Sequence, residues 1–285
     1  MPRPVIIVMF AALHGCENSE MKNDRPTIKI NFHEPIQSLL SQSTAPLSKD
    51  CNSDICFFEF DTSSASPNTA VLTFESSNQP MVFDDVISAA LVSYKSDTLL
   101  NSYVTLNGAA PNSEHELAMN YFSELQDKLS KAGWQRYIYP NEARIPATEI
   151  SKFKDVDEVL GIPVATGPWR DPTLGLNKNG WLSMPMFSNW LLYRDNEYLK
   201  VTVQRENGAQ APREKGSYLF TLTFRREADF YKGFVDDEDR ENWKALVPAE
   251  LKRMAQERAQ TEARLKKMGI AIDEDYQDPP IKALE

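Results

Sequence analysis

The strongest constraint on the fold is one amphipathic segment, residues 113–133, which lies between two groups of strand-like segments. Its apolar residues recur every four positions, at Leu117, Tyr121, Leu125 and Leu129. That period gives a helix a single apolar stripe. Ser113 and Glu116 have the spacing of a capping box, and Gly133 suits a helix stop. Because a one-sided helix needs a flat partner, we expect it to cover a sheet.

Strand-like segments alternate apolar with polar residues or are rich in branched and aromatic ones. They are 26–32, 56–60, 70–74, 86–94, 99–106, 134–139, 190–194, 198–205 and 218–226. We expect hairpins between 56–60 and 70–74, and between 86–94 and 99–106, whereas 41–55 reads as a loop. A short helix is expected over 151–160.

A second long helix is expected after the acidic residues that begin at Asp236. Pro248 suits its first turn and Gly269 its end. Strands, helix, strands and helix in this order predict an α+β fold with mostly antiparallel pairing. We expect two lobes of similar size, residues 27–145 and 146–270, and an extended tail over 271–285.

The N-terminus, MPRPVIIVMFAALHGC, has the order of an export signal. Arg3 supplies a positive start, and an uncharged apolar run then leads to Leu13-His14-Gly15-Cys16. The run is far shorter than the roughly 20 residues that span a membrane. The alternative is a buried first strand, VIIVMF.

This start resembles the signal peptide and lipobox of bacterial lipoproteins, although His14 stands where that family has a small residue. The resemblance implies removal of residues 1–15 and lipidation of Cys16, with residues 16–26 as a tether. It places the chain in the bacterial cell envelope, held by its lipid on the membrane and facing the periplasm. It does not indicate which membrane.

The other two cysteines, Cys51 and Cys56, are separated by four residues. A turn between them brings two cysteines within bridging distance, and an oxidising periplasm favours a disulfide. Two free thiols remain the alternative. No second cysteine pair or histidine cluster accompanies them in the sequence, so we expect no metal site.

The chain has 285 residues, 41% of them hydrophobic, which suits a globular core. Its formal net charge is -10. Such an acidic surface repels the phosphates of nucleic acids, so we expect no nucleic acid partner. A basic protein partner is compatible with this charge, and so is simple solubility.

We find no motif in the sequence that indicates catalysis or a cofactor. His115 lies in a predicted first helical turn without the second histidine of a zinc-protease helix, and we expect it to be solvated. His33 precedes Glu34-Pro35 at a strand end, and we assign it a structural role. We therefore expect a non-enzymatic protein with no cofactor. A Ser/His/Asp site with partners far apart in sequence stays open as an alternative.

Two groups of residues are candidates for binding a protein partner. Aromatic side chains favour interfaces because they bury a large area at low entropic cost. The aromatic candidates are Trp169, Trp181, Phe187 and Trp190, for each of which core packing is the alternative. The acidic candidates are Asp236, Asp237 and Asp239, for which a solvated helix start is the alternative.

The layout of lipobox, α+β body, LSKAGWQRYIYPNEARIP and the late ERAQTEARLKKMGIAIDEDYQDPP resembles immunity lipoproteins. Those proteins protect bacteria from periplasmic effectors of type VI secretion. The resemblance implies a stoichiometric toxin inhibitor that needs a complementary surface and no catalytic residues. An envelope assembly or structural lipoprotein, and an exported hydrolase, are the alternatives.

Overall fold

The computed structural model describes residues 25–66, 68–75, 79–95 and 97–285. Within these residues the chain forms one large, mostly antiparallel sheet with helices packed on it, which confirms the predicted α+β class. The expected signal segment, residues 1–15, and the expected lipidation site Cys16 lie outside the described residues. Among the described helices, none has both the length and the apolar character needed to cross a membrane.

The N-terminal half of the sheet is organised around the 14-residue strand β5 (Met81–Tyr94). Its first half pairs with β4 (Ala70–Phe74) and its second half with β3 (Ile55–Asp61). The expected hairpin between 56–60 and 70–74 is therefore wrong, because both strands pair with β5 instead of with each other. The outer strands are β1 (Thr27–Ile30), parallel to β4, and β2 (Ser48–Asn52), antiparallel to β3.

The C-terminal half consists of β11 (Phe187–Arg194), β12 (Glu197–Asn207) and β13 (Lys215–Arg226). Strand β6 (Leu99–Leu106) forms the expected hairpin with β5 and also pairs with β13, so one sheet runs through both expected lobes. The remaining short strands are β7 (Ser113–Glu114), β8 (Gln135–Arg136), and the separate pair β9 (Glu158–Val159) and β10 (Ile162–Pro163).

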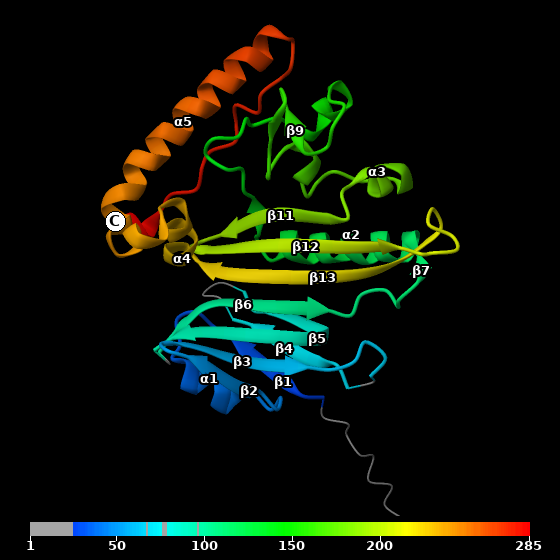
Figure 1. Ribbon diagram of the computed structural model, residues 1–285, viewed down its shortest axis with the longest axis vertical. Helices are drawn as coiled ribbons and strands as arrows, with labels where there is room; N and C mark the ends of the chain where they lie inside the picture. Colours follow the sequence, from blue (N-terminus) through cyan, green and yellow to red (C-terminus); the bar gives the residue numbers. More distant parts are fainter. Residues whose placement is uncertain (1–24, 67, 76–78, 96) are drawn as a thin grey trace, which may run out of the picture.

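Helix α2 (His115–Lys131) is the predicted amphipathic helix, and it lies behind β11, β12 and β13 in Figure 1. Its buried face differs from the expected one, because Leu117 is 56% exposed. The buried residues are His115, Ala118, Phe122, Leu125 and Leu129. The capping box is absent, since the Ser113 hydroxyl donates to the carbonyl of Ala110.

The other helices are α1 (Ile36–Gln42), α3 (Lys178–Ser183), α4 (Glu227–Tyr231) and α5 (Trp243–Lys267). Short 3-10 turns are η1 (Ala147–Lys152), η2 (Pro168–Arg170), η3 (Lys232–Phe234), η4 (Asp237–Asn242) and η5 (Lys282–Leu284). The helix expected over 151–160 is only η1, and 41–55 contains β2 rather than loop alone. Helix α5 begins one turn before Pro248, not at it.

Side chains from the two faces of the sheet enter two separate cores. On the α2 side, Phe122 contacts Trp190, and Phe224 stacks on Phe74 at 4.3 Å between ring centroids. On the opposite side, Phe230 of α4 stacks on Tyr198 at 3.9 Å. This second core lies at one end of the strands only, beneath α4 and the start of α5.

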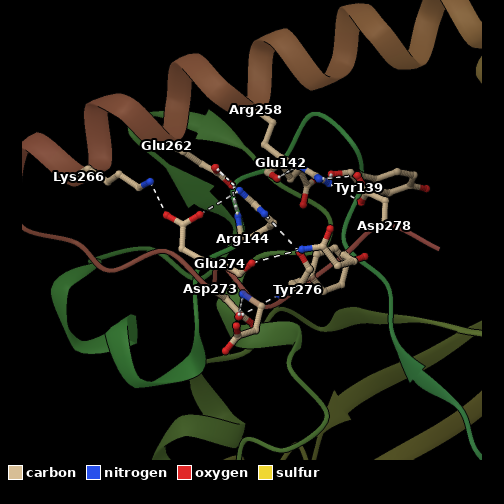
Figure 2. A network of polar contacts seen from close by, with 12 residues as sticks. Tyr139, Glu142, Arg144, Arg258, Glu262, Lys266, Asp273, Glu274, Tyr276 and Asp278 are labelled. Atoms are coloured by element: carbon tan, nitrogen blue, oxygen red, sulfur yellow. Dashed lines mark hydrogen bonds and ion pairs between the residues drawn. The ribbon is translucent and has the colours of Figure 1, made fainter. Parts of the chain in front are cut away.

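Helix α5 is fixed by a polar clamp that joins it to segment 138–144 and to the C-terminal tail (Figure 2). Glu262 of α5 accepts hydrogen bonds from the Arg144 side chain at 2.8 Å and from its backbone N–H at 3.1 Å. Arg258 of α5 donates to Asp278 of the tail at 2.7 Å and to the carbonyl of Tyr139 at 2.7 Å. The C-terminal tail returns alongside α5 and ends in the turn η5 (Figure 1).

Candidate interaction surface

The aromatic candidates separate into two groups. Trp169, Trp181 and Trp190 are buried in the main core, so their rings are not available to a partner in this structure. Phe187, the first residue of β11, is 62% exposed. Of the four aromatic candidates, the structure therefore leaves Phe187 on the surface.

The acidic candidates Asp236, Asp237 and Asp239 are all exposed at the turn η4, ahead of α5. Asp237 forms an ion pair with Arg240 at 2.6 Å. These carboxylates lie on the solvated turn that leads into α5, and they remain accessible.

Cys51 and Cys56 form the predicted disulfide. They are directly opposite each other on β2 and β3, with 4.1 Å between their α-carbons. The bond therefore fastens the hairpin end of the outer strand β2.

Strands β11, β12, β13 and β6 have one face that α2 does not cover. Because alternate residues of a strand point to opposite faces, the residues next to buried Phe220, Leu222 and Phe224 point away from the core. We call these outward residues the open face. They are Asn101, Tyr103, Thr105, Phe187, Asn189, Lys200, Thr202, Gln204, Leu219, Thr221, Thr223 and Arg225.

Apolar side chains stand on the open face at separated points. Phe187 and Leu219 both pair with Gln204, one from each side, and Leu219 is 43% exposed. Tyr103 is 39% exposed on the neighbouring strand β6. In Figure 1 no helix is drawn in front of the middle of these strands, and α4 lies only at one end. The open face thus offers three large side chains on a rigid sheet.

Hydroxyl groups fill the space between these side chains. Thr202, Thr221 and Thr105 are cross-strand neighbours on β12, β13 and β6. Thr105 and Thr221 share a hydrogen bond of 3.3 Å, and Thr202 donates to the Asn189 side chain at 2.7 Å. The row can still accept or donate hydrogen bonds toward solvent, because a hydroxyl has three bonding positions.

Two cations, Lys200 and Arg225, lie on the open face toward α4. Lys200 is opposite Thr223, and Arg225 is opposite Tyr198, so the two cations are diagonal neighbours on β12 and β13. Both side chains are partly buried, and neither forms a side-chain hydrogen bond or ion pair within the described part of the chain. Burial, and then the charge of Arg225, lower the pKa of Lys200.

His115 is fully buried, which corrects the expectation that it is solvated. The indole N–H of Trp181 donates to the Tyr218 hydroxyl at 2.9 Å, and that hydroxyl is within 2.5 Å of His115 Nδ1. His115 Nε2 is 3.1 Å from the carbonyl of Pro212. If the Tyr218 hydroxyl donates to Nδ1 and Nε2–H donates to the carbonyl of Pro212, every donor in this series of hydrogen bonds has an acceptor. Both ring nitrogens are thereby occupied in structural hydrogen bonds.

A cleft of about 410 Å³ lies on the α2 side of the sheet, between α2, β8 and the tail. Trp134 and Trp190 line it, together with Arg136 and Asp171. Arg136 is bound to Asp171 at 3.2 Å and to the carbonyl of Gly167 at 2.8 Å. The cleft has the volume of a small-molecule site, although its arginine is engaged within the fold. Among the described residues, no group of three His, Cys, Asp or Glu side chains could hold a metal ion.

Comparison with known proteins gives no relative that would assign this surface. No family model, curated protein or solved structure matches the chain.

Proposed function

We propose that this chain is a non-enzymatic, protein-binding lipoprotein of the bacterial envelope that neutralises a toxin effector of type VI secretion. Cys16 carries the lipid, and the folded part faces the periplasm. The observation that supports binding is the open face, where Phe187, Leu219 and Tyr103 are exposed on the same side of one sheet. Large side chains on a rigid support bind at low entropic cost.

A stoichiometric inhibitor needs this kind of surface. It acts by covering its target, so shape and contact area decide its effect and no turnover is required. The sheet holds the contact residues in fixed register, and the paired strands β12 and β13 each contribute several of them. The leader sequence supports the periplasmic location, where such an inhibitor would meet an incoming effector.

The biological test is deletion of this chain in a strain that carries its toxin. We expect deletion cells to be killed by sister cells and to be rescued by the intact chain. The Cys16→Ala variant tests the anchor, and it should lose incorporation of labelled palmitate and membrane fractionation. Survival of the deletion strain under attack would contradict the immunity function.

The binding test replaces Phe187 and Leu219 by alanine, singly and together. Truncation of a central interface residue costs about 2 kcal/mol, which corresponds to a loss of roughly 30-fold in affinity. The matched control is Leu117→Ala, since the exposure of Leu117 lies between those of Phe187 and Leu219 but the residue is on α2, on the other side of the sheet. Calorimetry with the purified effector should show weakened binding for the first variants and unchanged binding for the control. Equal affinities throughout would exclude the open face.

A further inference from the structure

The open face also indicates what kind of partner it fits. We propose that Lys200 and Arg225 together receive carboxylates from an acidic segment of the bound protein. This inference rests on the proposed function, because it describes the partner of the same surface. It adds a site for charged groups and specifies that the bound segment of the partner is negatively charged, which the apolar contacts alone do not specify.

The first support is the position of the two cations. Lys200 and Arg225 belong to neighbouring strands and point to the same side, two positions apart in register. Diagonal positions of this kind are about 7–8 Å apart, within reach of long side chains. A carboxylate placed between the two groups could therefore contact both, or two carboxylates of one segment could take one cation each.

The second support is that these cations differ from the other buried or partly buried cations that line the core. Five arginines form ion pairs with carboxylates, namely Arg136, Arg144, Arg170, Arg194 and Arg258. Arg205 instead donates to the carbonyls of Trp181, Leu182 and Met184. A partly buried cation without such a partner loses hydration without compensation. Lys200 and Arg225 are both partly buried without such a partner. The repulsion between their positive charges adds to the free-energy cost of burying each one.

The third support is the absence of carboxylates among their neighbours on the sheet. The residues that pair with them on β6, β11 and β13 are neutral, namely Asn101, Leu191 and Thr223. On β12 the first acidic residue of the same face is Glu206, six residues from Lys200, or about 20 Å along a strand. Across the strands from Lys200, the successive paired residues are Thr223, Tyr103 and Ala90. The first acidic residue in this series is Glu59 on β3.

The net charge of the whole chain makes this site selective. With a charge of -10, most of the surface repels an acidic partner. Such a partner is attracted where two cations stand together, so repulsion elsewhere favours one orientation. The hydroxyls of Thr202 and Thr221, beside Lys200, can bind polar groups of the same segment. The occupant we assign is therefore a protein segment that presents glutamate or aspartate side chains.

The test uses the full mature chain and a synthetic probe, an octapeptide of alternating glutamate and threonine. We expect its binding, followed by NMR of the labelled protein, to shift signals of residues 101–105, 198–204 and 219–225. The Lys200→Glu/Arg225→Glu variant should bind the peptide at least tenfold more weakly. An alternating lysine and threonine peptide should not shift these signals in the wild-type protein.

The matched control is Lys252→Glu/Arg264→Glu, which makes the same charge change at exposed residues of α5. If it weakens binding as much as the open-face variant does, only overall charge matters and the proposal is overturned. Failure of the glutamate peptide to bind wild-type protein also overturns it. If the reversed-charge variant does not fold, Lys200→Thr/Arg225→Thr takes its place, with the same tenfold loss expected.

The two proposals can fail separately. If the effector binds the wild type and the Lys200/Arg225 variant equally well, the acidic-segment inference is wrong and the immunity function stands. If the peptide binds through these cations but the deletion strain survives attack, the immunity function is wrong and the recognition site stands.

Discussion

Cations occur in two contrasting settings in this protein. In the polar clamp, Arg144 and Arg258 each have carboxylate partners and backbone carbonyls within hydrogen-bond distance (Figure 2). On the open face, Lys200 and Arg225 have neither. Arg258 is buried and the other three cations are partly buried, yet only the first pair has carboxylate partners within the described part of the fold.

The difference indicates two uses of charge. The clamp connects segments that are far apart in the sequence, since Arg144 and Glu262 are 118 residues apart. Ion pairs of this kind hold the long helix and the tail in place. The cations of the open face form no hydrogen bond or ion pair within the described chain, and on our proposal a bound partner would supply the missing carboxylates. Sites of function often carry such uncompensated cost.

The largest expected effect comes from breaking the clamp with Glu262→Ala. Removing one member of a buried ion pair costs about 3 kcal/mol of unfolding free energy. Without Glu262, Arg144 keeps only the longer ion pair with Glu274, at 3.8 Å. Urea unfolding measures this loss. The control Glu257→Ala removes an exposed ion pair on the same helix and should change stability by only about 0.5 kcal/mol. Similar losses in both variants would remove the distinction between the two settings.

Acid should weaken the clamp in a more graded way. Burial alone would raise the pKa of Glu262, but hydrogen bonds from Arg144 and the charge of Arg258 outweigh burial and lower this pKa. The folded state therefore binds the proton less readily than the unfolded state does. Ionised Glu262 therefore contributes to the free energy of unfolding at pH values above the ordinary carboxyl pKa. This contribution is lost as the pH falls through the lowered pKa of the folded state.

The measurement is unfolding free energy against pH, from neutral down to acid, for the wild type and for Glu262→Ala. We expect the difference between the two proteins to narrow as pH falls below the ordinary carboxyl range. A constant difference at all pH values would show that the charge of Glu262 is not what stabilises the clamp.

The smallest effect, of opposite sign, is expected on the open face. Lys200→Thr removes an unpaired cation beside Arg225 and should raise stability by about 0.5 kcal/mol, the scale of a single surface charge interaction. Gln204→Thr is the control, because it introduces the same residue on the same strand and face without a change of charge. A less stable Lys200→Thr protein would mean that Lys200 contributes to the fold, and the contrast with the clamp would be lost.

The sequence predicted the fold class and much of its local structure. The three strands β11, β12 and β13 and the helix α2 follow from apolar periodicity, and the disulfide follows from the spacing of Cys51 and Cys56. Pairing was less predictable. Strand β5 pairs with β4 and then with β3 along one edge, and the pairing with β4 has an irregularity between Ala70 and Leu72. Nothing in the spacing of 56–60 and 70–74 signals that arrangement.

The open face could be foreseen only in part. Lys200, Thr202 and Gln204 alternate with apolar residues on one strand, and Thr221 and Thr223 do so on the next, so a polar face on each strand can be read from the sequence. The joining of these faces into one surface depends on how the elements pack, and so does the position of α4 at one end, which leaves the middle of the strands without a described helix in front of it. His115 shows the same limit, because a helix-start residue becomes fully buried once Tyr218 and Pro212 surround it.

By itself, the sequence determined the long strands, the two long helices and the pairing of Cys51 with Cys56, because these depend on periodicity and short-range spacing. Only the tertiary structure decided which cations found partners. Arg144 forms an ion pair with Glu262 because segment 138–144 packs against α5. Arg258 forms an ion pair with Asp278 because α5 and the C-terminal tail run side by side. Lys200 and Arg225 came together at the edge of the second core, where the described residues offer neither side chain a hydrogen bond or an ion pair. Contacts between residues far apart in sequence set that outcome, and local patterns do not encode them.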